Sequence, residues 1–418
     1  MYLTPRSSIA NLDQEFNNTQ RRIAIKISLK RAWRFLRIGD PKVSLSICSQ
    51  FRKYLPHIGC LSILSFVMPG ASTYGYADRT STLQARPCTS ATAACTEWIK
   101  LGTGSARAMV YTTYSLNVRN TGIHRALIMI HGTNRNADHY FGTATSAGFL
   151  AGALDDTVVI APSFRSSDPG CMDKLQTDEI SWSCRGDSWR SGGTSTSNKD
   201  LTSFDFVDEL MRRLGDKKIF PNLTAIVIAG HSAGGQFVSR YEMANHAQDN
   251  LGIAVSYVVA NPSSYAWPDA TRVLPIDDGS AENAIAGWKA ETPHNKFSYG
   301  PFDATKAPDY DYWPYGLENR TTGYTVKMTD DQLKKQLVSR TTTYLLSQVD
   351  TLPLGGFDGS PSAMAQGATR RARGEAFVRY VNEQLGAKSS VMIIPECGHN
   401  DRCVYTTAEV LPVIFPKP

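Results

Sequence analysis

A serine placed between two glycines is the residue of this sequence best suited to covalent chemistry. Ser232 lies in the pentapeptide GHSAG, a pattern that is weak by itself because glycine and serine are common residues. The apolar run LTAIVIAG ends at Gly230, the first residue of this motif, and the helical pattern QFVSRYEM follows. A turn between strand and helix exposes the hydroxyl at a helix N-terminus, where backbone N–H groups favour developing negative charge. The context therefore predicts a nucleophile.

A nucleophilic serine needs a general base and an acid that orients the base. In an α/β sheet these three residues come in the order serine, acid, histidine, each just beyond a strand. Asp350 ends the apolar run TTYLLSQVD, and His399 lies four residues after a strand expected to end near Pro395. Of the histidines beyond residue 77, only His399 follows the last expected strand. Asp358 lies in the loop beyond Asp350, and from the sequence it can also serve as the acid.

The strands that would position these residues are short, apolar and bounded by Gly, Pro, Asp or Asn. Such continuous runs are typical of strands buried on both faces of a parallel sheet. We expect strands within the apolar runs at 125–132, 156–164, 223–230, 253–262, 342–350 and 390–400, with an antiparallel strand at 106–116 before them. Helices are expected at 202–214, which opens with a Thr202/Asp205 capping box, and at 370–385. This alternation indicates an α/β fold with right-handed crossovers.

The motifs IHGT, GHSAGG, the strand-terminal VD and ECGH, in that order, resemble those of the α/β-hydrolase superfamily. The resemblance runs from about residue 106 to the C-terminus and is closest in style to secreted esterases and polyhydroxybutyrate-depolymerase-like members. It implies a mostly parallel central sheet flanked by helices, with lid-like insertions. It also implies Ser232 as nucleophile, His399 as general base, Asp350 as its partner, and an oxyanion hole formed by N–H groups of Ala233 and near Thr133. His131 and His231 are expected to be structural.

Charge and hydropathy set residues 1–77 apart from the remainder of the 418-residue chain. This segment holds 11 Lys/Arg and 3 Asp/Glu, a net charge of 11 − 3 = +8. The whole chain has a net charge of +6, so residues 78–418 carry 6 − 8 = −2. Arg52 and Lys53 precede an apolar run of about 12 residues that ends in small residues, which is the layout of a signal peptide cleaved after Ala77. The run is shorter than the roughly 20 residues that span a bilayer. We therefore expect export to the periplasm or outside the cell, without a stable membrane anchor.

Residues 1–50 lie far upstream of the apolar run, which suggests an over-long translation start. A twin-arginine signal at Arg21-Arg22 is disfavoured by the same separation. Residues 78–418 are expected to form a single domain, and at 42% hydrophobic and 20% charged residues the composition is that of a globular protein, neither disordered nor fibrous.

The cysteines beyond the leader form three locally spaced pairs, as expected of disulfides in an exported chain. The pairs are Cys88 with Cys95, Cys171 with Cys184, and Cys397 with Cys403. Six cysteines allow 15 pairings, and we predict the nearest-neighbour scheme because it is the simplest of them. A metal site of Cys397, His399 and Cys403 is the alternative, but its spacing matches no usual zinc pattern. A bridge between Cys397 and Cys403 would restrain the loop that carries His399.

Two long insertions, at about 164–200 and 261–340, stand where this fold carries its lid. The second is rich in aromatic residues, which could line a pocket for an ester or form a small core of their own. Phosphate-binding, zinc and calcium motifs are absent from the sequence, so neither a cofactor nor a metal is expected, and the near-neutral body gives no reason to expect nucleic acid. The prediction is a serine esterase for a small or polymeric ester. A non-catalytic binding protein on the same scaffold, a peptidase and an acyltransferase remain alternatives.

Overall fold

The computed structural model describes residues 86–186, 188–275 and 297–417. The predicted leader and signal peptide at 1–77 lie outside the described residues, as does the part of the second insertion that contains Trp288. The sheet, the helices and the candidate site all lie within these ranges.

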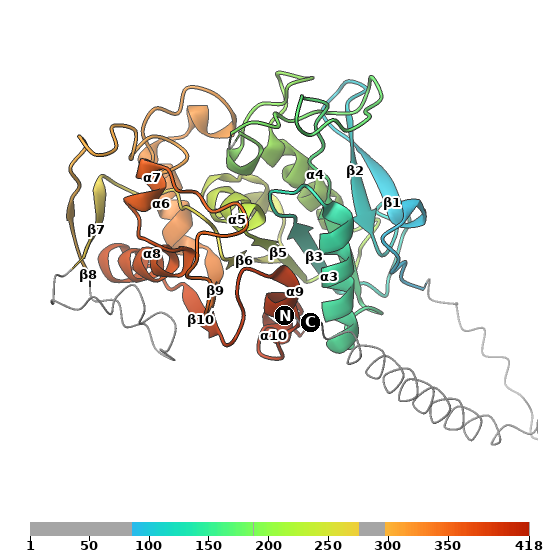
Figure 1. Cartoon of the computed structure of the whole chain (residues 1–418). Coiled ribbons are helices and arrows are strands. Elements are labelled where there is room, and N and C mark those ends of the chain that lie inside the picture. The colour runs from blue at the N-terminus through green and yellow to red at the C-terminus, as the bar shows by residue number, and fades with distance from the viewer. Residues whose placement is uncertain (1–85, 187, 276–296, 418) are drawn as a thin grey trace, which may run out of the picture. The chain divides into compact units, whose positions relative to one another are not determined.

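An eight-stranded sheet forms the centre of the molecule, in the order β1-β2-β4-β3-β5-β6-β9-β10 (Figure 1). The first two strands run antiparallel to their neighbours, and all pairs from β4 to β10 are parallel. The strands are β1 (Thr96–Lys100), β2 (Arg107–Thr112), β3 (Arg125–Ile130), β4 (Thr157–Pro162), β5 (Ala225–His231), β6 (Ala254–Ala260), β9 (Thr341–Ser347) and β10 (Ser390–Ile394). The predicted strands and the antiparallel strand before them are thus confirmed, with ends a few residues shorter. β1 was not predicted.

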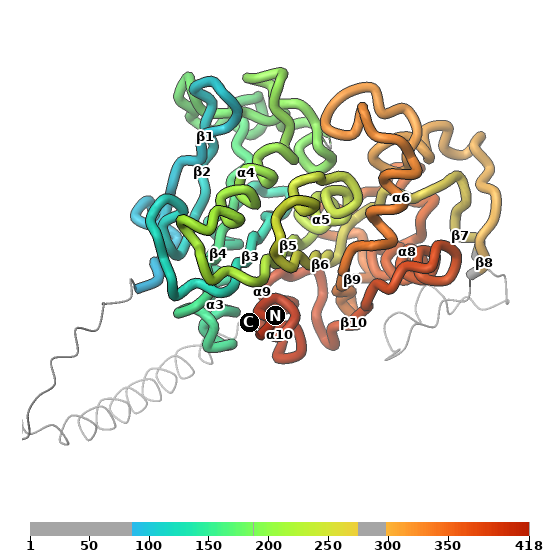
Figure 2. Tube along the Cα trace, turned by 180° about the vertical axis from the view of Figure 1, so that it is seen from behind, coloured from blue at the N-terminus to red at the C-terminus, as the bar shows by residue number. Residues whose placement is uncertain are grey.

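Helices cover both faces of this sheet, as Figures 1 and 2 show from opposite sides. The helices are α3 (Ala137–Leu150), α4 (Ser203–Gly215), α5 (Ala233–Ala244), α6 (Asp330–Ser339), α7 (Pro361–Met364), α8 (Arg370–Leu385), α9 (Asp401–Thr406) and α10 (Leu411–Ile414). Alternate strand residues point to opposite faces. Ala126 and Ile128 of β3 therefore join a core with α4, α5, α6 and α8, whereas Leu127 and Met129 join one with α3, α9 and α10. The mostly parallel, helix-flanked architecture predicted from the sequence is confirmed.

The start of α4 shows how local sequence sets the ends of these helices. The Thr202 side chain accepts a hydrogen bond from the Asp205 N–H, and the Asp205 carboxylate accepts one from the Thr202 N–H at 2.7 Å. This is the predicted capping box, which satisfies two backbone donors that the helix leaves unpaired. The predicted helix at 370–385 is also confirmed as α8. In contrast, α3 buries mainly small residues and lacks a strong apolar stripe, so its sequence gave little sign of a helix.

The two insertions lie between β4 and α4 and between β6 and α6. The second contains a small antiparallel pair, β7 (Thr271–Pro275) with β8 (Phe297–Pro301), and the short helix η6 (Tyr324–Lys327). Its aromatic residues Tyr265 and Trp267 are fully buried and contact Phe377 of α8, with ring centroids 4.4 and 5.6 Å away. These two side chains therefore belong to the hydrophobic core. Over the described ranges, no helix is both long and apolar enough to cross a membrane.

Candidate active site

Ser232 lies at the sharp turn between β5 and α5, with φ 61° and ψ −121°. This left-handed φ is unfavourable for a residue with a Cβ and is therefore a point of backbone strain. The flanking glycines allow the turn to pack tightly. A Cβ on Gly230 would lie 2.3 Å from the Gly234 carbonyl oxygen, and a Cβ on Gly234 would lie 2.2 Å from that of Ile130. A side chain at either position would displace the serine.

The structure brings Ser232, His399 and Asp350 together from loops that are distant in sequence. His399 Nε2 lies 2.9 Å from Ser232 Oγ, and His399 Nδ1 lies 2.7 Å from Asp350 Oδ2. Asp350 is 3% exposed and Ser232 8% exposed, so solvent competes little for these contacts. The arrangement can move a proton from a hydroxyl to an imidazole while a carboxylate orients the ring.

Asp358, the alternative acid, does not contact His399. Its carboxylate accepts a hydrogen bond from the Tyr315 hydroxyl at 2.8 Å and another from the Ser360 N–H at 3.0 Å. Between the two acids that the sequence left open, the geometry therefore favours Asp350 as the partner of the imidazole.

Arg370, which sequence reasoning missed, lies behind Asp350. Its Nη1 is 3.3 Å from Asp350 Oδ1, the oxygen that His399 does not use. The guanidinium also donates to Ser263 Oγ at 2.8 Å and to the Gly355 carbonyl at 2.9 Å. Burial lowers the pKa of Arg370, and the Asp350 charge opposes that change. Both carboxylate oxygens of Asp350 are thus engaged and the carboxylate is held in one orientation.

A covalent ring and a carboxylate anchor restrain the loop that carries His399. Cys397 and Cys403 form a disulfide around it, as the sequence predicted. Within the ring, Asp401 accepts a hydrogen bond from Thr143 Oγ1 at 2.7 Å and lies 3.0 Å from His139 Nε2. Both partners belong to α3. No local pattern predicts this anchor, because Asp401 and Thr143 are 258 positions apart.

The loop after β3 carries Thr133 and lies directly beside the turn that carries Ser232. A Cβ on Gly234 would also lie 2.7 Å from the carbonyl oxygen of His131, so the two backbones touch. The N–H of Ala233 is in the first turn of α5, where backbone donors have no partner within the helix. Above this region, a Cβ on Gly355 would lie 3.0 Å from His399 Cδ2 and one on Gly356 would lie 3.2 Å from Thr133 Cγ2. The segment after Asp350 therefore contacts both His399 and Thr133.

A sequence model of the alpha/beta hydrolase family matches residues 127–411, or 285 of the 418 residues. The chain belongs to the alpha/beta hydrolase family. The match contains Thr133, Ser232, Asp350 and His399.

Solved structures with similar folds include several hydrolases. One is a poly(3-hydroxybutyrate) depolymerase from Bordetella parapertussis, 19% identical over 74% of this chain and 89% of its own, with a TM-score of 0.47. Another is poly(aspartic acid) hydrolase-1 from Sphingomonas sp. KT-1, 21% identical over 74% and 95% of the two chains, with a TM-score of 0.48. A carboxylesterase from a metagenomic library is 14% identical over 76% and 85%, with a TM-score of 0.38. No curated protein sequence matches. At such low identity, these structures say nothing of what this chain cleaves.

Two buried histidines of this hydrolase flank the site, and both have structural contacts. His131 Nε2 accepts a hydrogen bond from the Phe164 N–H at 3.1 Å, and Nδ1 lies 2.9 Å from the Gly132 carbonyl, so Nδ1 carries the proton. Burial lowers the pKa of His131 to about 4. Burial, followed by the nearby His399, lowers the pKa of His231 well below its usual range. Both rings are therefore neutral at pH 7 and add no charge beside His399.

All three predicted disulfides are present in this hydrolase: Cys88–Cys95, Cys171–Cys184 and Cys397–Cys403. The alternative of a metal site at Cys397, His399 and Cys403 is therefore disfavoured, since bonded sulfurs are not thiolate ligands. Nowhere in the described parts of the chain do three His, Cys, Asp or Glu side chains group so as to hold a metal ion.

Proposed function

We propose that this chain is a secreted serine hydrolase that cleaves carboxylic esters through an acyl-enzyme intermediate. The observation that carries the proposal is the continuous chain of contacts from Asp350 Oδ2 through His399 to Ser232 Oγ, at 2.7 and 2.9 Å, on a strained turn between strand and helix. A serine that only closed a turn would need neither the imidazole nor the buried carboxylate behind it.

In the proposed reaction, Ser232 Oγ attacks the ester carbonyl carbon while His399 Nε2 takes the hydroxyl proton. The carbonyl oxygen becomes an oxyanion, which accepts hydrogen bonds from the N–H groups of Ala233 and Thr133. The C–O bond to the alcohol then breaks, and His399 returns the proton to the departing alkoxide. Water, deprotonated by His399, then attacks the acyl carbon. The bond from that carbon to Ser232 Oγ breaks, His399 returns the proton to Oγ, and the carboxylic acid leaves. Asp350 stabilises the imidazolium in both steps. This chemistry requires no cofactor.

The substrate of the proposed enzyme is a small-molecule or polymeric carboxylic ester. Export is supported by the leader, whose layout is that of a signal peptide, and by the three disulfides, which persist in oxidising compartments. Sequencing of the exported protein should give an N-terminus near Asp78. An exported chain that still began at Met1 would contradict the signal-peptide assignment.

A fluorophosphonate probe and two variants test the catalytic proposal. The probe should label the wild-type protein, and Ser232→Ala should abolish labelling without unfolding the protein. Ser232→Ala and His399→Ala should each lower turnover by on the order of 10⁴-fold or more. A folded wild-type protein that resists the probe would favour the non-catalytic binding protein. For an active enzyme, turnover of p-nitrophenyl esters of increasing chain length is compared with turnover of matched anilides, which a peptidase would also cleave. An added acceptor alcohol tests for acyl transfer and so distinguishes the esterase from an acyltransferase.

A further inference from the structure

Arg135 follows the loop that carries Thr133, and its backbone is held in an unfavourable conformation. Its φ is 55°, in the left-handed region that a non-glycine residue rarely adopts. The Arg135 N–H donates to the Gly132 carbonyl at 3.1 Å, which closes a tight turn around Thr133. Strain of this kind persists only when surrounding contacts fix the residue. In Arg135 these contacts are made by the side chain.

The Arg135 side chain binds three main-chain carbonyls of the first insertion. Nη1 donates to the Phe164 carbonyl at 3.0 Å and is 3.5 Å from that of Trp182, and Nη2 donates to that of Ser183. The guanidinium is also 5.5 Å from the centre of the Trp189 ring. Burial lowers the pKa of Arg135 to about 10, so the group stays charged at pH 7 and its hydrogen bonds are charge-assisted.

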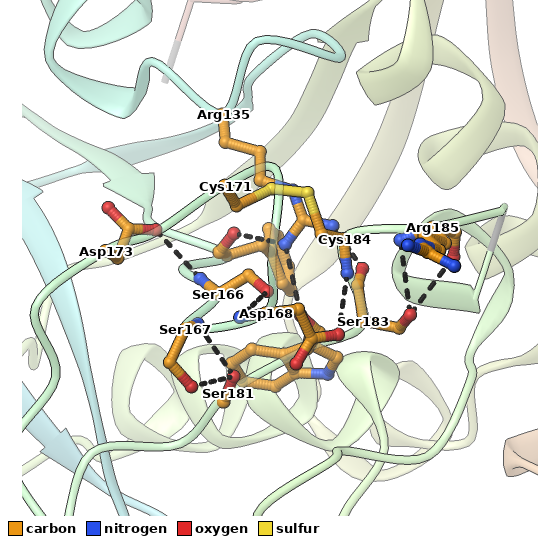
Figure 3. The surroundings of a disulfide bond; sticks show 12 residues. Arg135, Ser166, Ser167, Asp168, Cys171, Asp173, Ser181, Ser183, Cys184 and Arg185 are labelled. Carbon is orange, nitrogen blue, oxygen red and sulfur yellow. Dashed lines mark hydrogen bonds between the residues drawn. A yellow bond between two sulfur atoms is a disulfide. The ribbon is translucent and has the colours of Figure 1, made fainter.

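The segment that receives these bonds is itself closed by a disulfide, Cys171–Cys184 (Figure 3). Its two arms also pair through the backbone, with the Trp182 N–H donating to the Arg165 carbonyl at 3.0 Å. The Cys184 N–H donates to the Asp168 carboxylate at 3.2 Å. The carbonyls bound by Arg135 therefore lie on a braced surface.

Side chains at both ends of the Thr133 loop bind the main chain of the same residue, Phe164. The Phe164 N–H donates to His131 Nε2 at 3.1 Å, and the Phe164 carbonyl accepts from Arg135 Nη1 at 3.0 Å. Thr133 lies between these two anchors, and its own side chain is exposed. The position of the Thr133 N–H is therefore set by the anchors on either side of it.

We propose that Arg135 is a positioning residue that holds the Thr133 N–H against the developing oxyanion by fastening its loop to the disulfide-closed segment. The inference rests on the proposed function, since it requires an oxyanion at this place. An N–H that is displaced from the oxyanion loses stabilisation in the transition state and little in the ground state.

Arg135→Met tests this proposal, with Arg165→Met as its matched control. Arg165 lies in the same segment, and its side chain binds Glu179 at 2.7 Å and the Lys174 carbonyl at 3.1 Å, neither of which belongs to the Thr133 loop. A misplacement of about 1 Å can cost roughly 100-fold in rate. We expect Arg135→Met to lower kcat for p-nitrophenyl acetate by about 10- to 100-fold with KM within about twofold, and Arg165→Met to keep kcat within about threefold.

A transition-state analogue separates this role from simple loss of structure. A phenylboronic acid should bind Arg135→Met more weakly by a factor similar to the loss in kcat, while inhibition by the carboxylic acid product stays unchanged. Equal losses of kcat in both variants, or an unchanged kcat in folded Arg135→Met, would overturn the proposal. If Arg135→Met does not fold, Arg135→Lys replaces it. The lysine ammonium is a single point of contact and cannot reproduce the forked guanidinium, so kcat should still fall while KM stays unchanged. Wild-type kcat in Arg135→Lys would overturn the proposal. A wild-type enzyme that resists fluorophosphonate would instead refute the proposed function.

Discussion

Replacing Cys397 and Cys403 together by serine should lower kcat by about 10-fold and lower Tm by only about 3 °C. The disulfide closes a short ring, with a sequence separation of 6. In the loop-entropy description, a ring of this size stabilises the folded state by only about 2 kcal/mol. For a domain of some 340 residues, whose unfolding entropy is near 0.7 kcal/mol/K, that corresponds to a fall in Tm of about 3 °C.

The effect on rate follows from what the ring contains. His399 must stay within hydrogen-bond reach of Ser232, a distance of 2.9 Å in this structure. Without the ring, the contacts of Asp401 with Thr143 and His139 still hold the C-terminal side of the loop. We therefore expect kcat to fall by about 10-fold, less than the roughly 100-fold that accompanies a full 1 Å displacement.

The chain supplies a matched control in the Cys88–Cys95 disulfide. Its sequence separation is 7, and Cys95 is as buried as Cys397, at 2% and 1% exposure. It lies just before β1, whereas Cys397 follows β10 at the opposite edge of the sheet. The double serine variant at Cys88 and Cys95 should lower Tm by a similar amount and leave kcat unchanged. Steady-state assays with a p-nitrophenyl ester and thermal unfolding measure both quantities. Equal kcat in the two variants would refute the reasoning.

Three further predictions concern buried charges. Asp350→Asn should lower kcat far more than Asp358→Asn, because only Asp350 contacts His399; steady-state assays of both decide, and greater damage from Asp358→Asn would refute the assignment. Arg370→Met should lower kcat with KM unchanged, because Asp350 Oδ1 loses its cationic partner and the carboxylate no longer holds His399 in one orientation, and Arg370→Lys should restore part of kcat; wild-type kcat in folded Arg370→Met would refute this role. Burial raises the pKa of Glu242 from 4.5 to about 8, so the folded state binds the proton more tightly than the unfolded state and wild-type stability should fall as pH rises through this window. Glu242→Gln should remove that fall, which is at most about 1.4 kcal/mol per pH unit. Urea unfolding of both proteins at pH 5 and pH 8 measures it, and an equal change in the free energy of unfolding in the two proteins would contradict the prediction.

Local sequence was sufficient to predict the parts of the site that depend on neighbouring residues. The turn at Ser232 was predictable because strand, glycines and helix adjoin one another in the chain. The choice between Asp350 and Asp358 was not, because they are eight positions apart and both follow the same strand. Only the packing of the loop, which turns Asp358 toward Tyr315, separates them.

Arg370 shows why the support of the site escaped prediction. In the sequence it reads as a charged residue at the start of an amphipathic helix, where arginine is normally solvated. In the fold it is 1% exposed, because the segment after Asp350 covers the beginning of α8. Its partner Ser263 lies 107 positions away. A buried cation of this kind depends on contacts that no local pattern contains.

The topology of the sheet explains why the His399 loop needs more restraint than the others. β10 lies three strands from β5, or about 14 Å at the usual spacing, so the loop must turn back across the sheet edge to reach Ser232. The turn is made at Glu396, whose φ is 58°, and by the Cys397 N–H donating to the Pro395 carbonyl at 2.7 Å. The Val349 N–H also donates to the Cys397 carbonyl at 3.0 Å, so the acid loop moves with the histidine loop. Opening the ring should therefore disturb the contact between His399 and the serine before the contact between His399 and the acid. A ring variant should accordingly react with fluorophosphonate more slowly than the wild type does.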